Sequence, residues 1–297
     1  MDNITLRQLR YFDAVARLGH FGHAADACAI TQPALSMQIK ELEATVGAPL
    51  FERTTRNIRL TTFGEEYVKR VRDILRAVDE LGDFARTAAT GIAGPLRIGV
   101  IPTVAPYLLP SLMRQIDTVF PSLTVHIRET ITPRLIEELT AGRIDTAIVA
   151  LPVSETQFEE VPLFTEDFVL VRPENDANKP VPSAEILREM RLLLLEEGHC
   201  FRDQALSFCS MPSVRPREVM DGSSLSTLVQ MVGAGMGVTL IPEMAVPVET
   251  RSASVAVSHF PDPQPRRTIG MIWRKTSPLS DHLRQISDVV RSCRQDQ

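Results

Sequence analysis

The stretch TQPALSMQIKELEATVG, residues 31–47, decides how the first part of the chain folds. Its apolar side chains recur every three or four residues, at Leu35, Ile39, Leu42 and Val46. That spacing is typical of a helix with one buried face. Thr31 suits the N-cap position and Pro33 the first turn, where its missing N–H costs little. We therefore predict an amphipathic helix that begins after Thr31 and ends at Gly47.

The exposed side of this helix carries short polar side chains. The candidates for contact with DNA are Thr31, Gln32, Pro33, Ser36, Gln38 and Lys40. Gln can pair with adenine edges in a major groove, and Ser or Thr can bind bases or phosphates. These side chains favour a recognition helix.

Shorter patterns flank this helix on both sides. LRQLRYFDAVARLG (6–19) repeats apolar residues at three-residue spacing, at Leu6, Leu9, Phe12 and Val15. FGHAADACAI (21–30) is short and rich in alanine, so both segments predict helices. FERTTRNIRLTTFG (51–64) surrounds a turn expected at Asn57 with basic side chains, namely Arg53, Arg56 and Arg59. Such a wing sets Arg against phosphate or the minor groove, although three Arg on a hairpin can also be only a solvated surface.

Three helices followed at once by a basic hairpin resemble the winged helix-turn-helix domain of the LysR-type transcriptional regulators. The resemblance implies such a domain over residues 1–62 and double-stranded promoter DNA as its partner. The net charge of −5 does not oppose this. Residues 1–94 carry 12 Lys/Arg and 12 Asp/Glu, and the acidic excess lies in the remainder, with 20 and 25. A neutral domain with locally clustered Arg can still attract phosphate.

Residues 63–91 predict one long linker helix. Its apolar positions alternate steps of four and three, at Tyr67, Val71, Ile74, Val78, Leu81, Ala85 and Ala88. This is a heptad seam, which a partner helix would cover; the alternative is packing against the chain's own domain. We expect a homodimer, which matches the two half-sites that helix-turn-helix proteins read, and further assembly into a homotetramer.

After GIAGP (91–95), strand and helix patterns alternate, which implies an α/β fold with parallel sheets and ligands beyond the strand ends. Thr103 and Thr132 each follow a predicted strand, and Ser223 and Ser224 stand at a helix start, as ligand groups or simply as N-caps. Residues 92–297 resemble the two-lobed, periplasmic-binding-protein-like effector domain of the same family. One hypothesis is therefore a regulator that responds to a small anionic metabolite in the inter-lobe cleft.

EEGHCFRDQALSFC, residues 196–209, suggests a second hypothesis. Cys200 has polar neighbours that can favour a thiolate: His199, Arg202 and Asp203. Cys209 has apolar neighbours, so we expect Cys200 to attack and Cys209 to resolve. If the intervening residues are helical, the two cysteines lie about 13 Å apart along the axis, beyond the roughly 7 Å limit for a disulfide. Closing that bond would have to unwind the segment.

GHCFRDQALSFC closely resembles the redox centre of the peroxide-sensing LysR-type activators, as do IPTVAPYLLP, SLSTLVQMVGAGMGVTLIP and PQPRRTIG. The likeness extends over essentially the whole chain. It implies that Cys200 reacts with hydrogen peroxide to give a sulfenic acid, with which Cys209 condenses. It also implies peroxide-binding groups at Thr103, Thr132, His199, Arg202, Asp203 and Arg267. Arg266 adjoins Arg267, so the choice between these two cations stays open.

The remaining expectations concern setting and partners. No window holds the roughly 20 apolar residues of a membrane span, and the start lacks the apolar core of a secretion signal, so we expect a cytoplasmic protein without membrane contact. We expect no cofactor and no metal site, because no second Cys/His pair has ligand spacing. Residues 1–90 would be of no use to a thiol peroxidase, which favours a regulator over an enzyme. By resemblance, RNA polymerase and a glutaredoxin- or thioredoxin-type reductant are partners. Cys28 and Cys293 are expected to be structural.

Overall fold

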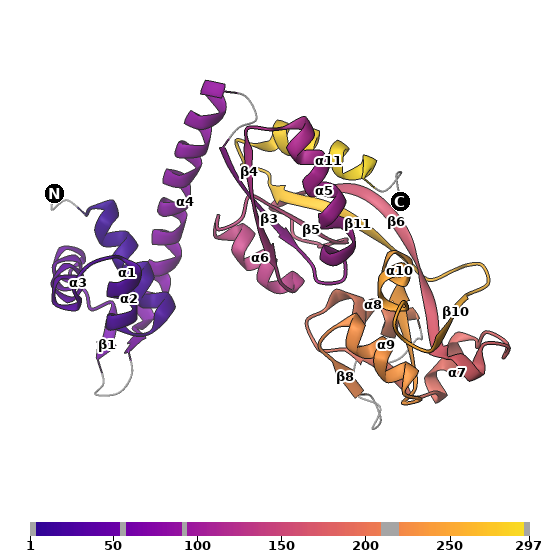
Figure 1. Ribbon diagram of the computed structural model, residues 1–297. Coiled ribbons are helices and arrows are strands. Elements are labelled where there is room, and N and C mark those ends of the chain that lie inside the picture. The colour runs from indigo at the N-terminus through magenta and orange to yellow at the C-terminus, as the bar shows by residue number, and fades with distance from the viewer. Residues whose placement is uncertain (1–3, 54–57, 91–93, 209–219, 294–297) are drawn as a thin grey trace. The chain divides into compact units, whose positions relative to one another are not determined.

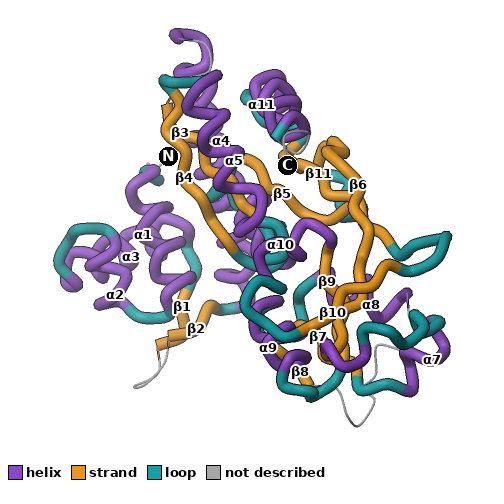
Figure 2. The backbone as a smooth tube through the Cα atoms, turned by 45° about the vertical axis from the view of Figure 1, so that its right-hand side comes forward, coloured by secondary structure: helices purple, strands orange, loops and turns teal. Residues whose placement is uncertain are grey.

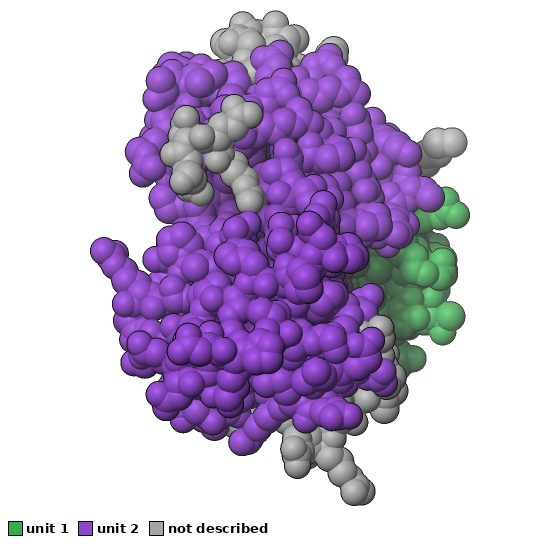
Figure 3. All heavy atoms as spheres, turned by 90° about the vertical axis from the view of Figure 1, so that its right-hand side faces the viewer, with its two compact units in different colours: residues 1–85 green, residues 86–297 purple. Residues whose placement is uncertain are grey.

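The computed structural model describes residues 4–53, 58–90, 94–208 and 220–293. The chain forms two compact units, residues 1–85 and residues 86–297, which Figure 3 draws in green and purple. No helix in the described ranges is long and apolar enough to cross a membrane.

The first unit consists of four helices and a short antiparallel hairpin (Figure 1). The elements are α1 (Leu6–Leu18), α2 (Phe21–Ala27), α3 (Gln32–Val46), β1 (Phe51–Arg53), β2 (Ile58–Leu60) and α4 (Thr62–Thr90). Thr5 and Gln8 form a capping box at the start of α1, and Gly19 ends that helix in the left-handed conformation that favours glycine. The helices and the wing predicted from the sequence are confirmed.

The core of this unit contains the apolar stripe of α3. Leu35, Ile39 and Leu42 are fully buried, and Phe12 from α1 packs with them. Leu6 lies in the first turn of α1, as its spacing predicted, but it is exposed, and the buried part of the stripe begins at Leu9. Periodicity identifies an apolar face but not where along the helix its cover begins.

The second unit is built on one nine-stranded sheet. Its strands are β3 (Gly94–Val100), β4 (Leu123–Glu129), β5 (Thr146–Leu151), β6 (Phe158–Pro173), β7 (Leu192–Leu195), β8 (Met220–Gly222), β9 (Val238–Pro242), β10 (Val255–His259) and β11 (Arg266–Arg274). They follow the order β4-β3-β5-β11-β6-β9-β7-β8, and β10 pairs with β6. The helices are α5 (Ala105–Val119), α6 (Thr132–Thr140), α7 (Ala184–Glu189), α8 (Cys200–Phe208), α9 (Leu225–Gly233), α10 (Val246–Glu249) and α11 (Ser280–Ser292).

The sheet divides into two lobes joined by the 16-residue strand β6, which runs from one to the other (Figures 1 and 2). Lobe I holds β3, β4, β5, β11, α5, α6 and α11, and lobe II holds β7 to β10 and α7 to α10. Each lobe has its own apolar core. The expected parallel pairing holds for β3 with β4 and β5, and for β7 with β8 and β9. It is wrong for β11, which pairs antiparallel with β5 and β6 because the chain crosses between the lobes and returns. The strands β6 and β10, which were not predicted from the sequence, also pair antiparallel with their neighbours.

Candidate functional site

The helix α3 carries the predicted DNA-contact residues on the outside of the first unit. Thr31 occupies the N-cap, but its side chain makes no capping hydrogen bond within the described residues. Gln32, Pro33 and Lys40 are exposed, and Ser36 and Gln38 are partly exposed. The Gln38 amide donates to Glu41 at 2.7 Å, so this side chain is partly committed within the helix.

The hairpin β1–β2 follows α3 as a wing. Arg53 pairs with Ile58 in its backbone register. The Arg53 side chain and all of Arg56 lie outside the described residues, while Arg59 is exposed on β2. The contribution of Arg53 and Arg56 to DNA binding therefore stays a prediction.

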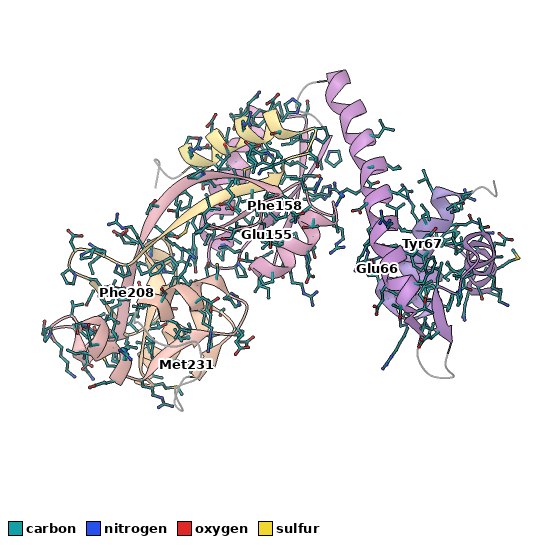
Figure 4. The ribbon with its side chains drawn as sticks, turned by 180° about the vertical axis from the view of Figure 1, so that it is seen from behind. Glu66, Tyr67, Glu155, Phe158, Phe208 and Met231 are labelled. Atoms are coloured by element: carbon teal, nitrogen blue, oxygen red, sulfur yellow. The ribbon has the colours of Figure 1, made fainter. Side chains whose placement is uncertain are left out.

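The seam predicted along α4 divides into two parts. Tyr67 and Val71 pack into the core of their own unit, as the alternative interpretation had it, with the Tyr67 ring 5.6 Å from that of Phe12. Figure 4 shows Tyr67 on the side of α4 that faces the other helices. Farther along, Ile74 and Leu81 are 47 % and 67 % exposed. Only this later part of the stripe is available to a partner, so assigning Val71 to the seam was wrong.

Cys200 is the first residue of α8 and lies where the two lobes meet. It is half-buried and packs against the core of lobe I, although α8 belongs to lobe II. Gly198 adopts φ +95°, and a Cβ at this position would come within 2.8 Å of Ile131 on lobe I, so glycine permits this approach. Backbone N–H groups at a helix start stabilise nearby negative charge, which suits a sulfur that reacts as an anion.

A buried ion pair lies beside this helix. The guanidinium of Arg267 contacts Glu166 at 2.7 Å, and both side chains are 0 % exposed. Arg267 also donates from Nη1 to the Thr103 hydroxyl at 2.8 Å, and it lies over the ring of Phe201, 5.3 Å from the centroid. Of the two adjacent cations, Arg267 is the buried one, whereas Arg266 is exposed.

The three polar residues next to Cys200 in the sequence, His199, Arg202 and Asp203, differ in burial. Burial lowers the pKa of His199, and the nearby Glu196 carboxylate opposes that shift, so His199 is neutral at pH 7. Arg202 is buried and donates from Nη1 to the Leu195 carbonyl at 2.7 Å, which ties α8 to the end of β7. Asp203 is exposed.

Two buried polar atoms near this site have no hydrogen-bond partner among the described residues. One is the hydroxyl oxygen of Thr132, in the first turn of α6, and the other is the amide oxygen Oε1 of Gln204, one turn after Cys200 on α8. Buried polar atoms are normally paired, so these two are available to a small hydrogen-bonding molecule. Gln204 was not predicted from the sequence, because an amide residue inside a helix carries no distinguishing pattern.

A cleft of about 400 Å³ opens between the lobes. Thr103 and His199 line it, together with Ser223 and Ser224. Ser224 is the N-cap of α9, where its hydroxyl accepts from the Thr227 N–H at 3.2 Å. Two carboxylates also line the cleft, Glu129 and Glu249. These acidic groups disfavour an anionic ligand there.

Cys28 and Cys293 have different surroundings from Cys200. Cys293 is buried and directs its thiol to the Val289 carbonyl at 3.2 Å, as a structural cysteine would. Cys28 is half-buried, and burial raises its pKa while Arg17 opposes this. Cys209 lies outside the described residues. Nowhere in the described ranges do three His, Cys, Asp or Glu side chains gather as they would around a metal ion.

A winged helix-turn-helix unit joined to a two-lobed α/β domain defines a DNA-binding regulator with an effector domain. Residues 6–65 match the bacterial regulatory helix-turn-helix family of the LysR type, and residues 89–294 match the LysR substrate binding domain. The chain belongs to the LysR family of bacterial regulatory proteins.

Within this family the chain closely resembles the OxyR regulators. It is 40 % identical over 292 residues to the DNA-binding transcriptional dual regulator OxyR of Escherichia coli K12, covering 97 % of this chain and 95 % of the relative. It is 41 % identical to a probable hydrogen peroxide-inducible genes activator of Streptomyces viridosporus, and the match covers 98 % of this chain and 95 % of that relative.

Solved structures of OxyR proteins share the fold. A cysteine-to-aspartate variant of full-length OxyR from Pseudomonas aeruginosa superimposes with a TM-score of 0.77 at 35 % identity, covering 99 % of this chain and 96 % of that one. A hydrogen-peroxide-bound cysteine variant of OxyR from Corynebacterium glutamicum superimposes with a TM-score of 0.67 at 35 % identity. The match covers 99 % of this chain and 94 % of that one.

Proposed function

We propose that this protein is a cytoplasmic transcriptional regulator that senses hydrogen peroxide through Cys200 and Cys209. The observation that carries the proposal is the position of Cys200. It opens α8 at the lobe junction, and its neighbour Phe201 lies under Arg267, which donates to Thr103. Gly198, two residues before it, approaches Ile131, which precedes Thr132, whose hydroxyl has no hydrogen-bond partner among the described residues. The names of the relatives support it, because one is named as an activator, and another as a probable activator, of hydrogen peroxide-inducible genes.

The chemistry has two steps. The Cys200 thiolate attacks one peroxide oxygen, an S–O bond forms, and the O–O bond breaks. The departing oxygen leaves with that electron pair as hydroxide, so the sulfur is oxidised by two electrons and the peroxide is reduced. The Cys209 thiolate then attacks the Cys200 sulfur, and the second hydroxide leaves as the disulfide forms. With the two thiol protons, the products are one disulfide and two waters.

The protein residues bind and orient the peroxide. Thr103, Thr132 and Arg267 supply hydrogen bonds to its oxygens, and hydrogen bonds to the oxygen that leaves stabilise its growing charge. The neutral His199 offers one donor or acceptor, while Arg202 holds α8 on β7. Asp203 is exposed and its part in peroxide binding stays a prediction.

The disulfide would act as the switch on DNA binding. Residues 200–208 are helical, and at about 1.5 Å of rise per residue a disulfide from Cys200 to residue 209 requires this helix to unwind. We infer that the unwinding of α8 changes how a dimer, or a tetramer, meets promoter DNA and RNA polymerase. A glutaredoxin- or thioredoxin-type dithiol would restore the reduced form by exchange.

Peptide mapping of purified protein after mild peroxide tests the proposal. Wild type should form the 200–209 disulfide, Cys209→Ser should stop at a sulfenic acid that dimedone traps, and Cys200→Ser should not react, while Cys293→Ser serves as the control that reacts normally. A response of Cys200→Ser equal to wild type would sink the proposal.

The same preparation distinguishes the other functions. A sensor consumes one equivalent of peroxide per chain, whereas a thiol peroxidase turns over when a reductant is supplied. A metabolite-responsive regulator would change its DNA footprint in the Cys200→Ser variant when the metabolite is added. The carboxylates of Glu129 and Glu249, which line the cleft, would repel an anionic metabolite.

A further inference from the structure

Glu166, Arg267 and Thr103 form a buried network of hydrogen bonds. Of these three residues, Glu166 has no role in the peroxide chemistry proposed above. It stands directly opposite Arg267 in the antiparallel pairing of β6 with β11. Arg267 donates from Nε and Nη2 to Glu166 Oε1, at 2.8 and 2.7 Å. A buried guanidinium that loses its counter-charge is strongly destabilised. Glu166 therefore permits a fixed cation at this position.

The fixed cation determines the direction of one hydroxyl. Thr103 accepts from Arg267 Nη1 at its Oγ1, and its carbonyl accepts from Nη2 at 3.1 Å. A threonine hydroxyl has a single hydrogen, and an oxygen that accepts from a guanidinium directs that hydrogen elsewhere. No acceptor for it is present among the described residues, and Thr103 lines the inter-lobe cleft. The Thr103 O–H is thus held as a donor toward a molecule in the cleft.

We propose that Glu166 is a positioning residue for the reaction of Cys200 with peroxide. Through Arg267 it fixes the Thr103 hydroxyl as a donor to the peroxide oxygen that leaves as hydroxide. This inference rests on the proposed function. The hydrogen bond from Thr103 stabilises the peroxide most as the O–O bond breaks, because the leaving oxygen gains negative charge only then.

The test compares two reactions of one thiol. Full-length reduced Glu166→Gln is oxidised by hydrogen peroxide and, separately, alkylated by iodoacetamide, which needs the Cys200 thiolate but breaks no O–O bond. We expect the second-order rate constant with peroxide to fall about tenfold to a hundredfold, since one oriented donor can contribute that much. The rate constant with iodoacetamide should change less than about twofold. Equal losses with both reagents would show that Glu166 only maintains the fold.

Two further variants make the test specific. Arg97 and Asp145 form another ion pair in lobe I, with a 2.6 Å contact and a buried carboxylate. Asp145→Asn is the matched control, and it should leave the ratio of the two rate constants unchanged. In a Thr103→Val background, adding Glu166→Gln should lower the peroxide rate by less than about twofold, because the hydroxyl through which Glu166 acts is already gone.

Glu166→Gln leaves the buried charge of Arg267 without its counter-charge, which could prevent folding. If Glu166→Gln does not fold, Glu166→Asp keeps the charge opposite Arg267 but shortens the side chain that holds the guanidinium, and a loss selective for peroxide is again expected. A wild-type peroxide rate in either variant overturns the inference. If instead the wild-type protein forms no sulfenic acid at Cys200, the proposed function has failed, and that result is distinct from the other two.

Discussion

Tyr107 of lobe I donates a 2.7 Å hydrogen bond to Glu249 of lobe II. The tyrosine ring is buried and belongs to the apolar core of lobe II, although its backbone lies on α5 of lobe I. The lobes are therefore joined by a side chain as well as by β6. This favours a switch that changes α8 locally over one that separates the lobes.

Tyr107→Phe should weaken this connection. At pH 7 we expect a loss of about 1 kcal/mol, the usual net value of one hydrogen bond. Burial and the hydrogen bond to Glu249 raise the pKa of Tyr107 above its ordinary value. Above pH 10 the unfolded chain releases this proton while the folded chain keeps it, so wild-type stability should fall with pH more steeply than that of the variant. Thermal unfolding between pH 7 and 11 measures both, with Tyr11→Phe as control.

His199→Gln should flatten the acid side of the stability profile. Burial lowers the pKa of His199, so the folded protein binds its proton less readily than the unfolded chain does. The stability contributed by His199 is complete above pH 6.5 and is lost as the pH falls from there toward the lower, folded pKa. Thermal melts at pH 7.5 and pH 5 should show a smaller decrease for the variant than for wild type. An identical decrease would contradict a His199 pKa that is lowered in the folded protein.

Ile74→Asp with Leu81→Asp should convert dimers into monomers. Both side chains lie exposed on α4, so the aspartates would place charges in the proposed seam without entering the core of the unit. Sedimentation gives the mass, and operator binding should weaken with it. Leu18→Asp, on an exposed apolar residue of α1, should leave the mass unchanged. Val71→Asp should instead unfold the first unit, because Val71 is buried there.

Lys40→Ala and Ser36→Ala should affect DNA binding in different ways. Removing one phosphate contact at Lys40 should lower the slope of log affinity against log salt by about 1. Loss of a base contact at Ser36 should cost about 1–3 kcal/mol on the preferred operator and little on other sequences. Fluorescence anisotropy across a salt series measures both effects. Lys69→Ala is the control, since Lys69 pairs with Glu66 on α4.

The sequence could predict elements whose signal is local. The buried stripe of α3 and the alternating strands of lobe I follow from period and composition alone, and the structure confirms them. The same reasoning failed for Val71, because periodicity shows that a face is apolar but not what covers it. The antiparallel strands were missed for a similar reason, since their direction depends on a crossover between lobes.

The buried network was beyond local reasoning. Glu166 is separated from Arg267 by 101 residues, and Thr103 from Arg267 by 164. An acidic residue in LFTEDFVLV indicates only an interruption of an apolar strand. Glu166 could have been predicted only from the pairing register of β6 with β11. This register places it opposite Arg267, which the sequence had already indicated as a candidate peroxide-binding residue.

The path of the chain through the lobes has a consequence for biosynthesis. Lobe II is made from a central portion of the sequence, whereas lobe I needs β11 and the final helix α11, whose Leu283, Ile286 and Val290 belong to its core. A nascent chain on the ribosome can therefore complete lobe II first. Arg267 emerges late, and the lobe I surface that covers Cys200 forms only afterwards. The buried contacts of Arg267 with Glu166 and Thr103 therefore cannot form before β11 has been synthesised.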